Sequence, residues 1–276
     1  MEFIAETTAD GVTERLFTLG EVPGVLWTPA GAGLPRPLVL MGHGGGQHKK
    51  APGILARARR FVTACGFAVA AIDAPGHGDR PLTEAEQREY ADLQRRIVAG
   101  QVAGPELIQA GAERAARALP EWIAVLDALQ AAGHTAGPVG YWGVSMGAVV
   151  GVPLAAAEPR IVAAVFGLVG DALAEAADRV TVPIEFLLQW DDELVSRASG
   201  LALFDAFGSA EKTLHANPGR HGALPAFEVD SSASFFRRHL SSQRPAPAPP
   251  RPGTSPGSRA GRRAGSRVPG TGRSGC

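Results

Sequence analysis

The chain has 276 residues, of which 45% are hydrophobic and 20% charged, a composition typical of a globular protein with one sizeable core. Its net charge is zero, yet residues 241–276 hold seven arginines and no acid, so residues 1–240 carry a net charge of about −7. This acidic balance argues against a nucleic-acid-binding body, and the lack of an apolar run of about eighteen residues argues against a membrane span.

The two chain ends and the cysteines indicate in which cellular compartment the protein is expected. The N-terminus carries acids and no long apolar stretch, so we expect no secretory signal. Cys65 lies in an apolar stretch and Cys276 ends the chain, which makes neither a disulfide framework nor a metal-binding pattern. We therefore expect a cytoplasmic protein that uses no metal or other cofactor. Residues 241–276 are rich in Pro, Gly, Ser and Arg and are expected to form a disordered tail.

Short apolar runs alternate with longer segments of helical periodicity. In chain order, the runs predicted as strands are 12–19, 22–29, 36–43, 67–78, 137–143, 161–170, 182–190 and 212–218. The segments predicted as helices are 51–66, 82–98, 112–133, 145–158, 195–207 and 229–240. Pro52 and Gly66 mark the two ends of the first helix, and Pro120 is expected to kink or split the third.

Strands separated by helices require crossover connections, which build a parallel sheet covered on both faces. The first two strands follow each other closely and are predicted to pair antiparallel. We therefore expect an α/β fold with a mostly parallel, eight-stranded sheet in one domain over residues 1–240. A charged helical insertion at about 81–111 is read either as a small lid or as a solvated helix face. Reactive groups of such sheets gather outside the carboxyl ends of the strands.

One serine stands in a tight turn at such a strand end. Gly143-Val144-Ser145-Met146-Gly147 is a G-x-S-x-G sequence between a predicted strand and a predicted helix. Such a turn strains its central residue and brings backbone segments close together, so side chains two positions away on either side would clash. The residues favour Ser145 as a nucleophile, with a helix N-cap as the alternative.

A serine nucleophile needs a base, and the base needs an acid that orients it. His221 lies in a loop after the last predicted strand, from which it can reach back over the strand ends. Asp191 and Asp192 directly follow the preceding strand. The chain order is therefore serine, acid, histidine, and periodicity alone leaves the choice between the two aspartates open.

Five stretches together resemble the α/β-hydrolase superfamily over roughly residues 10–240: "VLMGHGGG", "AIDAPGHGD", "GVSMG", "DDELV" and "PGRHG". Within it, the antiparallel lead strands and the lack of a large insertion after "VFGLVG" look most like the dienelactone hydrolase-like serine esterases and peptidases. The resemblance implies an α/β-hydrolase fold and aligns the acid with Asp192. Dienelactone hydrolases proper use a cysteine where this chain has Ser145, so dienelactone cleavage is not expected.

The resemblance also implies how the residues divide the chemistry. His221 takes the Ser145 proton, Asp192 orients His221, and the Met146 N–H and an N–H of the glycine loop bind the oxyanion. Gly45 is the expected loop donor and Gly44 its nearest competitor. His43, in the same loop, is expected to support the backbone. Trp190, Trp142 and His48 are weaker candidates for substrate binding. The alternative for these residues is packing in the core or exposure to solvent.

These observations predict a serine hydrolase that cleaves small, soluble carboxylic esters through an acyl-enzyme. The same catalytic set would also serve an acyltransferase or a hydrolase of amides, peptides or thioesters. A noncatalytic binding module on this fold is a further alternative, which the complete set of triad residues disfavours. The expected partner is a small-molecule ester rather than nucleic acid or membrane, and the oligomeric state stays open, a homodimer included.

Overall fold

A computed structural model of the protein describes residues 1–31, 33, 36–80, 82–101 and 104–241. The chain divides into one compact unit, Met1–Ser242, and a second segment, Gln243–Cys276. The tail that we expect to be disordered, apart from Ser241, lies outside the described residues.

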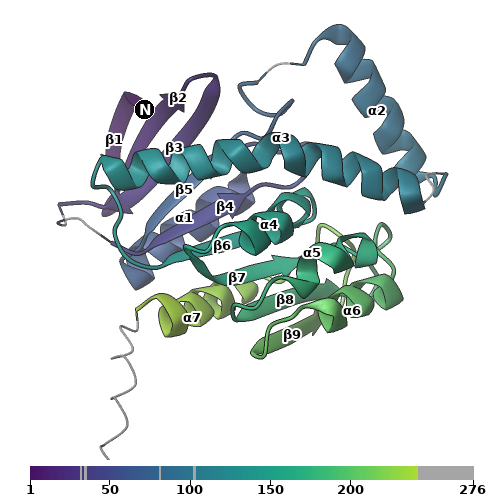
Figure 1. The fold of residues 1–276 in the computed structure, drawn as a ribbon. Helices are drawn as coiled ribbons and strands as arrows, with labels where there is room; N and C mark the ends of the chain where they lie inside the picture. The colour runs from purple at the N-terminus through teal and green to yellow at the C-terminus, as the bar shows by residue number, and fades with distance from the viewer. Residues whose placement is uncertain (32, 34–35, 81, 102–103, 242–276) are drawn as a thin grey trace, which may run out of the picture. The chain divides into compact units, whose positions relative to one another are not determined.

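The described part contains one nine-stranded sheet in the order β1-β2-β3-β5-β4-β6-β7-β8-β9 (Figure 1). Its strands are β1 (Glu2–Ala9), β2 (Val12–Leu19), β3 (Val22–Pro29), β4 (Leu38–Gly42), β5 (Ala68–Ile72), β6 (Val139–Val144), β7 (Ile161–Gly167), β8 (Ile184–Gln189) and β9 (Lys212–Asn217). The pairs β1·β2, β2·β3 and β3·β5 are antiparallel, and all pairs from β5 to β9 are parallel. The mostly parallel α/β sheet is therefore confirmed.

The prediction of eight strands was one short, because β1 was not recognised. Every residue of β1 is exposed, so the strand has no buried face that would give an alternating hydrophobic pattern. It lies at the sheet edge, where it pairs with β2 from Glu2 opposite Thr18 to Ala9 opposite Val12. Backbone hydrogen bonds to β2 hold this strand in the sheet, and such bonds leave no pattern in the sequence.

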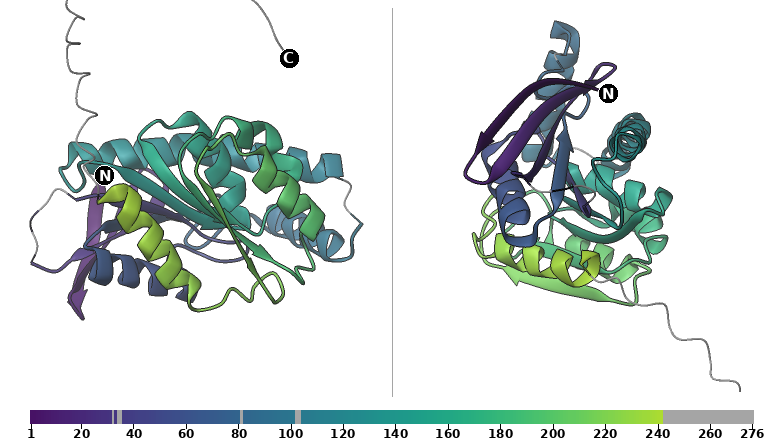
Figure 2. Two further views of the ribbon diagram at one scale, coloured as in Figure 1. Left: turned by 90° about the horizontal axis from the view of Figure 1, so that it is seen from below. Right: turned by 90° about the vertical axis from the view of Figure 1, so that its left-hand side faces the viewer.

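Helices cover both faces of the sheet (Figure 2). They are α1 (Pro52–Cys65), α2 (Glu84–Val98), α3 (Gly104–Ala131), α4 (Met146–Ala157), η1 (a short 3-10 helix, Asp171–Leu173), α5 (Ala174–Asp178), α6 (Arg197–Ala206) and α7 (Glu228–Leu240). The helices α1 and α7 pack on one face, whereas α3, α4, α5 and α6 pack on the other. No helix in the described ranges combines the length and apolarity needed to cross a membrane.

The central strands are buried on both faces, as parallel strands under two helical layers must be. On β4, Leu38 and Leu40 enter the core on the α3–α4 side, whereas Val39 and Met41 enter the core on the α1–α7 side. All four are at most 1% exposed. Burying each such side chain contributes roughly 1.5–3 kcal/mol, so the sheet is a rigid platform for the loops at its carboxyl edge.

The insertion after β5 forms α2 and the first turns of α3. The helix α3 begins at Gly104, earlier than the predicted residue 112. It continues through Pro120 as one helix, so Pro120 does not split it. Glycines at 100, 104 and 111 lower the local helix propensity, which is why the sequence pattern placed the start too late. In Figure 1, α2 lies beside the N-terminal part of α3 and away from the sheet.

Candidate active site

Ser145 occupies the turn between β6 and α4 in a backbone conformation that non-glycine residues rarely adopt. Its φ is 55° and its ψ −124°, and its N–H donates to the carbonyl of Gly167 at 2.9 Å. A strained residue of this kind persists only where its surroundings hold it, and such residues concentrate at functional sites. The turn presents the serine at the carboxyl edge of the sheet, at the N-terminus of α4.

The two flanking glycines are required by close backbone packing. A Cβ on Gly143 would lie 2.7 Å from the carbonyl oxygen of Gly147, and a Cβ on Gly147 would overlap the carbonyl oxygen of Gly42. Beneath the turn, the buried Tyr141 hydroxyl donates to the Gly147 carbonyl at 2.7 Å. The glycines therefore let the turn sit against the end of β4, where the glycine loop begins.

The structure brings Ser145, His221 and Asp192 together as one hydrogen-bonded chain, although they lie far apart in the sequence. The His221 Nε2 is 2.9 Å from the Ser145 Oγ, and the His221 Nδ1 is 2.8 Å from the Asp192 Oδ2. The Asp192 side chain is only 3% exposed. Burial alone would raise the pKa of this carboxyl, but the bonds from His221 and from two backbone N–H groups outweigh it and lower the pKa.

The neighbouring acids do different work. Asp191 Oδ2 accepts only a long 3.4 Å bond from the Gly219 N–H, and Glu193 Oε2 accepts the His221 backbone N–H at 2.9 Å. Neither has a hydrogen bond to the His221 ring among the described contacts. The arrangement therefore places Asp192, and not Asp191, against the imidazole.

The glycine loop after β4 supplies backbone N–H groups beside the serine. The Gly44 N–H already points to the Gln47 side-chain oxygen at 3.4 Å, whereas no acceptor for the N–H of Gly45 or Met146 is found among the described residues. This favours Gly45 over Gly44 as the loop donor that we predict to act with Met146.

His43 braces this loop from below and is 2% exposed. Its Nε2 accepts the Ala74 N–H at 3.0 Å, so the ring proton resides on Nδ1, which donates to the Gly44 carbonyl at 2.9 Å. Burial lowers the pKa of His43 to about 4, which keeps the ring neutral at neutral pH. The neutral ring thereby fixes the carbonyl beside the predicted oxyanion donor.

Sequence reasoning missed Gln189, which holds the loop that carries His221. The Gln189 amide nitrogen, at the end of β8, donates to the carbonyls of Ala223 at 2.8 Å and Arg220 at 3.3 Å. The residue is 1% exposed. The available signal was a polar side chain directly after the apolar run 186–188, because a buried amide must find partners.

The three lower-weight candidates make no described contact with the serine or histidine. Trp142 is 2% exposed and packs in the core, with the Arg57 guanidinium 4.5 Å from its ring centre. Trp190 is 38% exposed and stacks with Arg197, and His48 is exposed, its Nδ1 accepting a backbone N–H at 3.2 Å. A role in binding substrate remains a prediction for all three.

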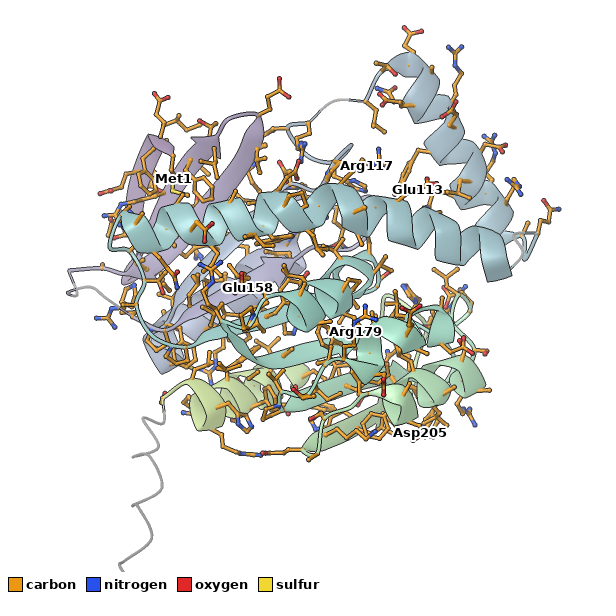
Figure 3. The ribbon with its side chains drawn as sticks, viewed as in Figure 1. Met1, Glu113, Arg117, Glu158, Arg179 and Asp205 are labelled. Atoms are coloured by element: carbon orange, nitrogen blue, oxygen red, sulfur yellow. The ribbon has the colours of Figure 1, made fainter. Side chains whose placement is uncertain are left out.

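A cavity of about 740 Å³ lies between α2, α3 and the loop after β5. Charged side chains dominate its lining, including Glu113 and Arg117, which Figure 3 marks on the part of α3 near α2. Tyr90 of α2 connects this cavity to the glycine loop: its hydroxyl is 3.3 Å from the His77 Nε2 and would be 3.4 Å from a Cβ on Gly45. The insertion thus reaches the predicted oxyanion donor, a contact that the sequence pattern did not reveal.

Lys49 was also missed, although it anchors the loop after β5 to the glycine loop. Its ammonium group lies 2.6 Å from carboxylate oxygens of both Asp73 and Asp79. The Asp73 side chain is fully buried and also accepts two backbone N–H groups. In the sequence, Lys49 follows a run of glycines and precedes another lysine, a pattern typical of a solvent-exposed loop. Its ion pairs with the two aspartates become visible only in the folded structure.

No protein-family model matches the chain, and no curated protein sequence matches it. Among solved structures, a PEG-bound cold-adapted esterase from an Arctic intertidal metagenomic library matches with 36% identity and a TM-score of 0.69. The match covers 87% of this chain and all of that one. A zinc-bound structure of a cold-adapted esterase from such a library matches with 34% identity and a TM-score of 0.64, over the same shares of the two chains.

A more distant match shows the breadth of the fold. The acetyl xylan esterase of Paenibacillus sp. R4 aligns over 87% of this chain and 88% of that one, with a TM-score of 0.63 and 15% identity. At that identity the likeness concerns the fold alone, whereas the likeness to the Arctic esterase extends to the sequence over that protein's whole length. The chain belongs to the esterase group of the α/β-hydrolase superfamily.

Proposed function

We propose that the protein is a serine carboxylesterase that cleaves small, soluble carboxylic esters through an acyl-enzyme. The observation that carries the proposal is the hydrogen-bonded chain from Ser145 Oγ through His221 to Asp192. A serine, a base within 3 Å of it and an acid that orients the base form the set that acyl transfer requires. A small-molecule ester is accordingly the proposed partner.

In the first half of the reaction, His221 Nε2 removes the proton from Ser145 Oγ as the oxygen attacks the ester carbonyl carbon. Asp192 holds the other ring proton on Nδ1 and stabilises the imidazolium that forms. The N–H groups of Met146 and Gly45 bind the developing oxyanion, and the N-terminus of α4 adds partial positive charge. The imidazolium then protonates the leaving alcohol as the C–O bond breaks.

In the second half, water replaces the alcohol. His221 takes a proton from the water, whose oxygen attacks the acyl carbon, and returns the proton to Ser145 as the carboxylic acid departs. Because Asp192 has a lowered pKa, it stays ionised while His221 cycles between its two states.

The preference for small, soluble esters follows from the charged cavity beside the glycine loop. A lipase that binds an oil interface needs an apolar lid, whereas α2 exposes Glu, Arg and Gln side chains over most of its length. Burying such groups against lipid would cost their hydration. We therefore expect short-chain esters to be better substrates than long-chain ones.

The test is hydrolysis of p-nitrophenyl acetate by Ser145→Ala. The rate should fall by at least about 10⁴-fold while the circular dichroism spectrum and melting temperature stay close to those of the parent. Ser234→Ala is the matched control, because Ser234 is an exposed serine of α7 whose hydroxyl bonds only within that helix, donating to the Asp230 carbonyl and accepting from Arg237. Activity retained in Ser145→Ala would refute the assignment of the nucleophile.

A further inference from the structure

A second cluster of polar side chains lies where β8, β9 and α7 meet, and none of its members belongs to the predicted triad. Glu185 comes from β8, His215 from β9, and Glu228 is the first residue of α7. His215 pairs in register with Leu187, which packs in the core on the α1–α7 side. Strand alternation places Glu185 on that same face, toward α7.

The cluster brings two buried carboxylates to one imidazole. Glu185 is 3% exposed and Glu228 1%, whereas the His215 side chain is 25% exposed and gives solvent a route to the group. A hydrogen bond to the Oε1 atom orients each carboxylate. Asn217 donates to Glu228 Oε1 at 2.7 Å, and Ser232 donates to Glu185 Oε1 at 2.8 Å. These bonds leave the Oε2 atoms of both glutamates directed at His215.

The spacing of the inward atoms matches metal coordination. The His215 Nδ1 lies 2.8 Å from Glu228 Oε2, and the His215 Nε2 lies 3.8 Å from Glu185 Oε2. The Ser231 hydroxyl donates to Glu185 Oε2 at 3.1 Å, and its oxygen lies 3.5 Å from the His215 Nδ1. One ligand atom from each of the three ionisable residues lies within 4.8 Å of the others. Tetrahedral ligands at bond lengths of about 2.0–2.1 Å are about 3.3 Å apart, within the range of these contacts.

The charge of the cluster also calls for a cation. Glu185 and Glu228 are both buried carboxylates, 3% and 1% exposed, and a bound cation would stabilise them. Arg57 interacts with Glu228 through its charge, but the Arg57 Nε has no hydrogen-bond partner among the described residues. A divalent ion between the two Oε2 atoms would balance the pair.

We propose that Glu185, His215 and Glu228 form a structural zinc site, with both Oε2 atoms and one imidazole nitrogen as protein ligands. Imidazole with carboxylate oxygens is a donor set that zinc accepts, and Asn217 and Ser232 are the outer groups that hold such ligands in place. Ser231 Oγ or a water completes four ligands. The ion joins α7 to the two strands that lead into the Asp192 and His221 loops.

The first experiment uses the full chain, stripped with EDTA and titrated with zinc sulfate. We expect one zinc per chain by calorimetry and, at a hundredfold excess over Kd, a melting temperature higher by about 5–10 °C. Glu185→Gln and His215→Asn should each weaken zinc binding at least tenfold. His239→Asn is the matched control, since His239 lies on α7 beside Glu211 at 3.4 Å, and it should bind zinc as the parent does.

A second measurement on the unaltered chain does not depend on whether the variants fold. X-ray absorption of the zinc-loaded protein should show a shell of nitrogen and oxygen ligands at about 2.0–2.1 Å and no sulfur shell at about 2.3 Å. A sulfur shell would assign the zinc to a cysteine and overturn the proposal. Undiminished zinc affinity in folded Glu185→Gln and His215→Asn, or no zinc binding by the parent chain, would overturn it equally.

Discussion

The buried His43 should make the protein less stable as the pH falls, by an amount that follows from its environment. Burial, opposed only in part by the bond to the Gly44 carbonyl, lowers the pKa of His43 from 6.5 to about 4. The unfolded chain therefore binds a proton at this residue between pH 6.5 and 4, and the folded chain does not. Stability is thus lost progressively as the pH falls through this window and is fully present above it.

The magnitude follows from the two pKa values. At pH 5, the difference between an unfolded pKa of 6.5 and a folded pKa of about 4 removes about 2 kcal/mol from the free energy of unfolding relative to pH 7.5. Other histidines add their own dependence, so the decisive quantity is a difference between variants. His43→Gln should lose about 2 kcal/mol less than the parent between pH 7.5 and 5.

The assay is urea unfolding at a series of pH values, followed by circular dichroism. His48→Gln serves as the control for replacing a histidine of this loop, because His48 lies in the same loop but is exposed. A stability difference between the parent and His43→Gln that does not change from pH 7.5 to 5 would contradict the lowered pKa of His43. That outcome would mean that His43 titrates alike in both states.

Three further outcomes are expected. Asp192→Asn should lower kcat in ester hydrolysis by up to about 10⁴-fold through the wrong imidazole tautomer, and Asp191→Asn less than tenfold; equal losses would remove the distinction between the two acids. Gly147→Ala should abolish activity or folding, since its methyl group meets the Gly42 carbonyl oxygen, and a fully active variant would contradict the described turn. Phe236→Ala, at a fully buried position, should cost about 3–5 kcal/mol in chemical unfolding, and a cost under 1 kcal/mol would contradict its burial.

The parts of the fold that could be predicted from sequence are those with a strong local pattern. The strands β4 to β8 are visible as short, mostly apolar runs, and the turn after β6 is visible as G-x-S-x-G. The edge strand β1 was missed because all of its residues are exposed, which leaves no alternating hydrophobic pattern. The short helices η1 and α5 were missed because eight residues carry too little periodicity to be recognised.

The candidate site divides in the same way. Ser145 and His221 stand in recognisable loops, but the side on which an aspartate points depends on backbone geometry after β8, so residue patterns left Asp191 and Asp192 open. Contacts between distant segments, such as Tyr90 beside Gly45, depend on how the insertion packs and leave no local signal. The same holds for the cluster around His215, whose members only the sheet register and α7 bring together.

The role of Ser145 as the nucleophile is tested by labelling the native protein with a fluorophosphonate, followed by peptide mapping. We expect one equivalent of label on Ser145, loss of esterase activity in proportion to labelling, and no label on Ser145→Ala. Stoichiometric labelling of another residue, or full esterase activity in a chain that carries no label, would contradict the claim that Ser145 is the nucleophile.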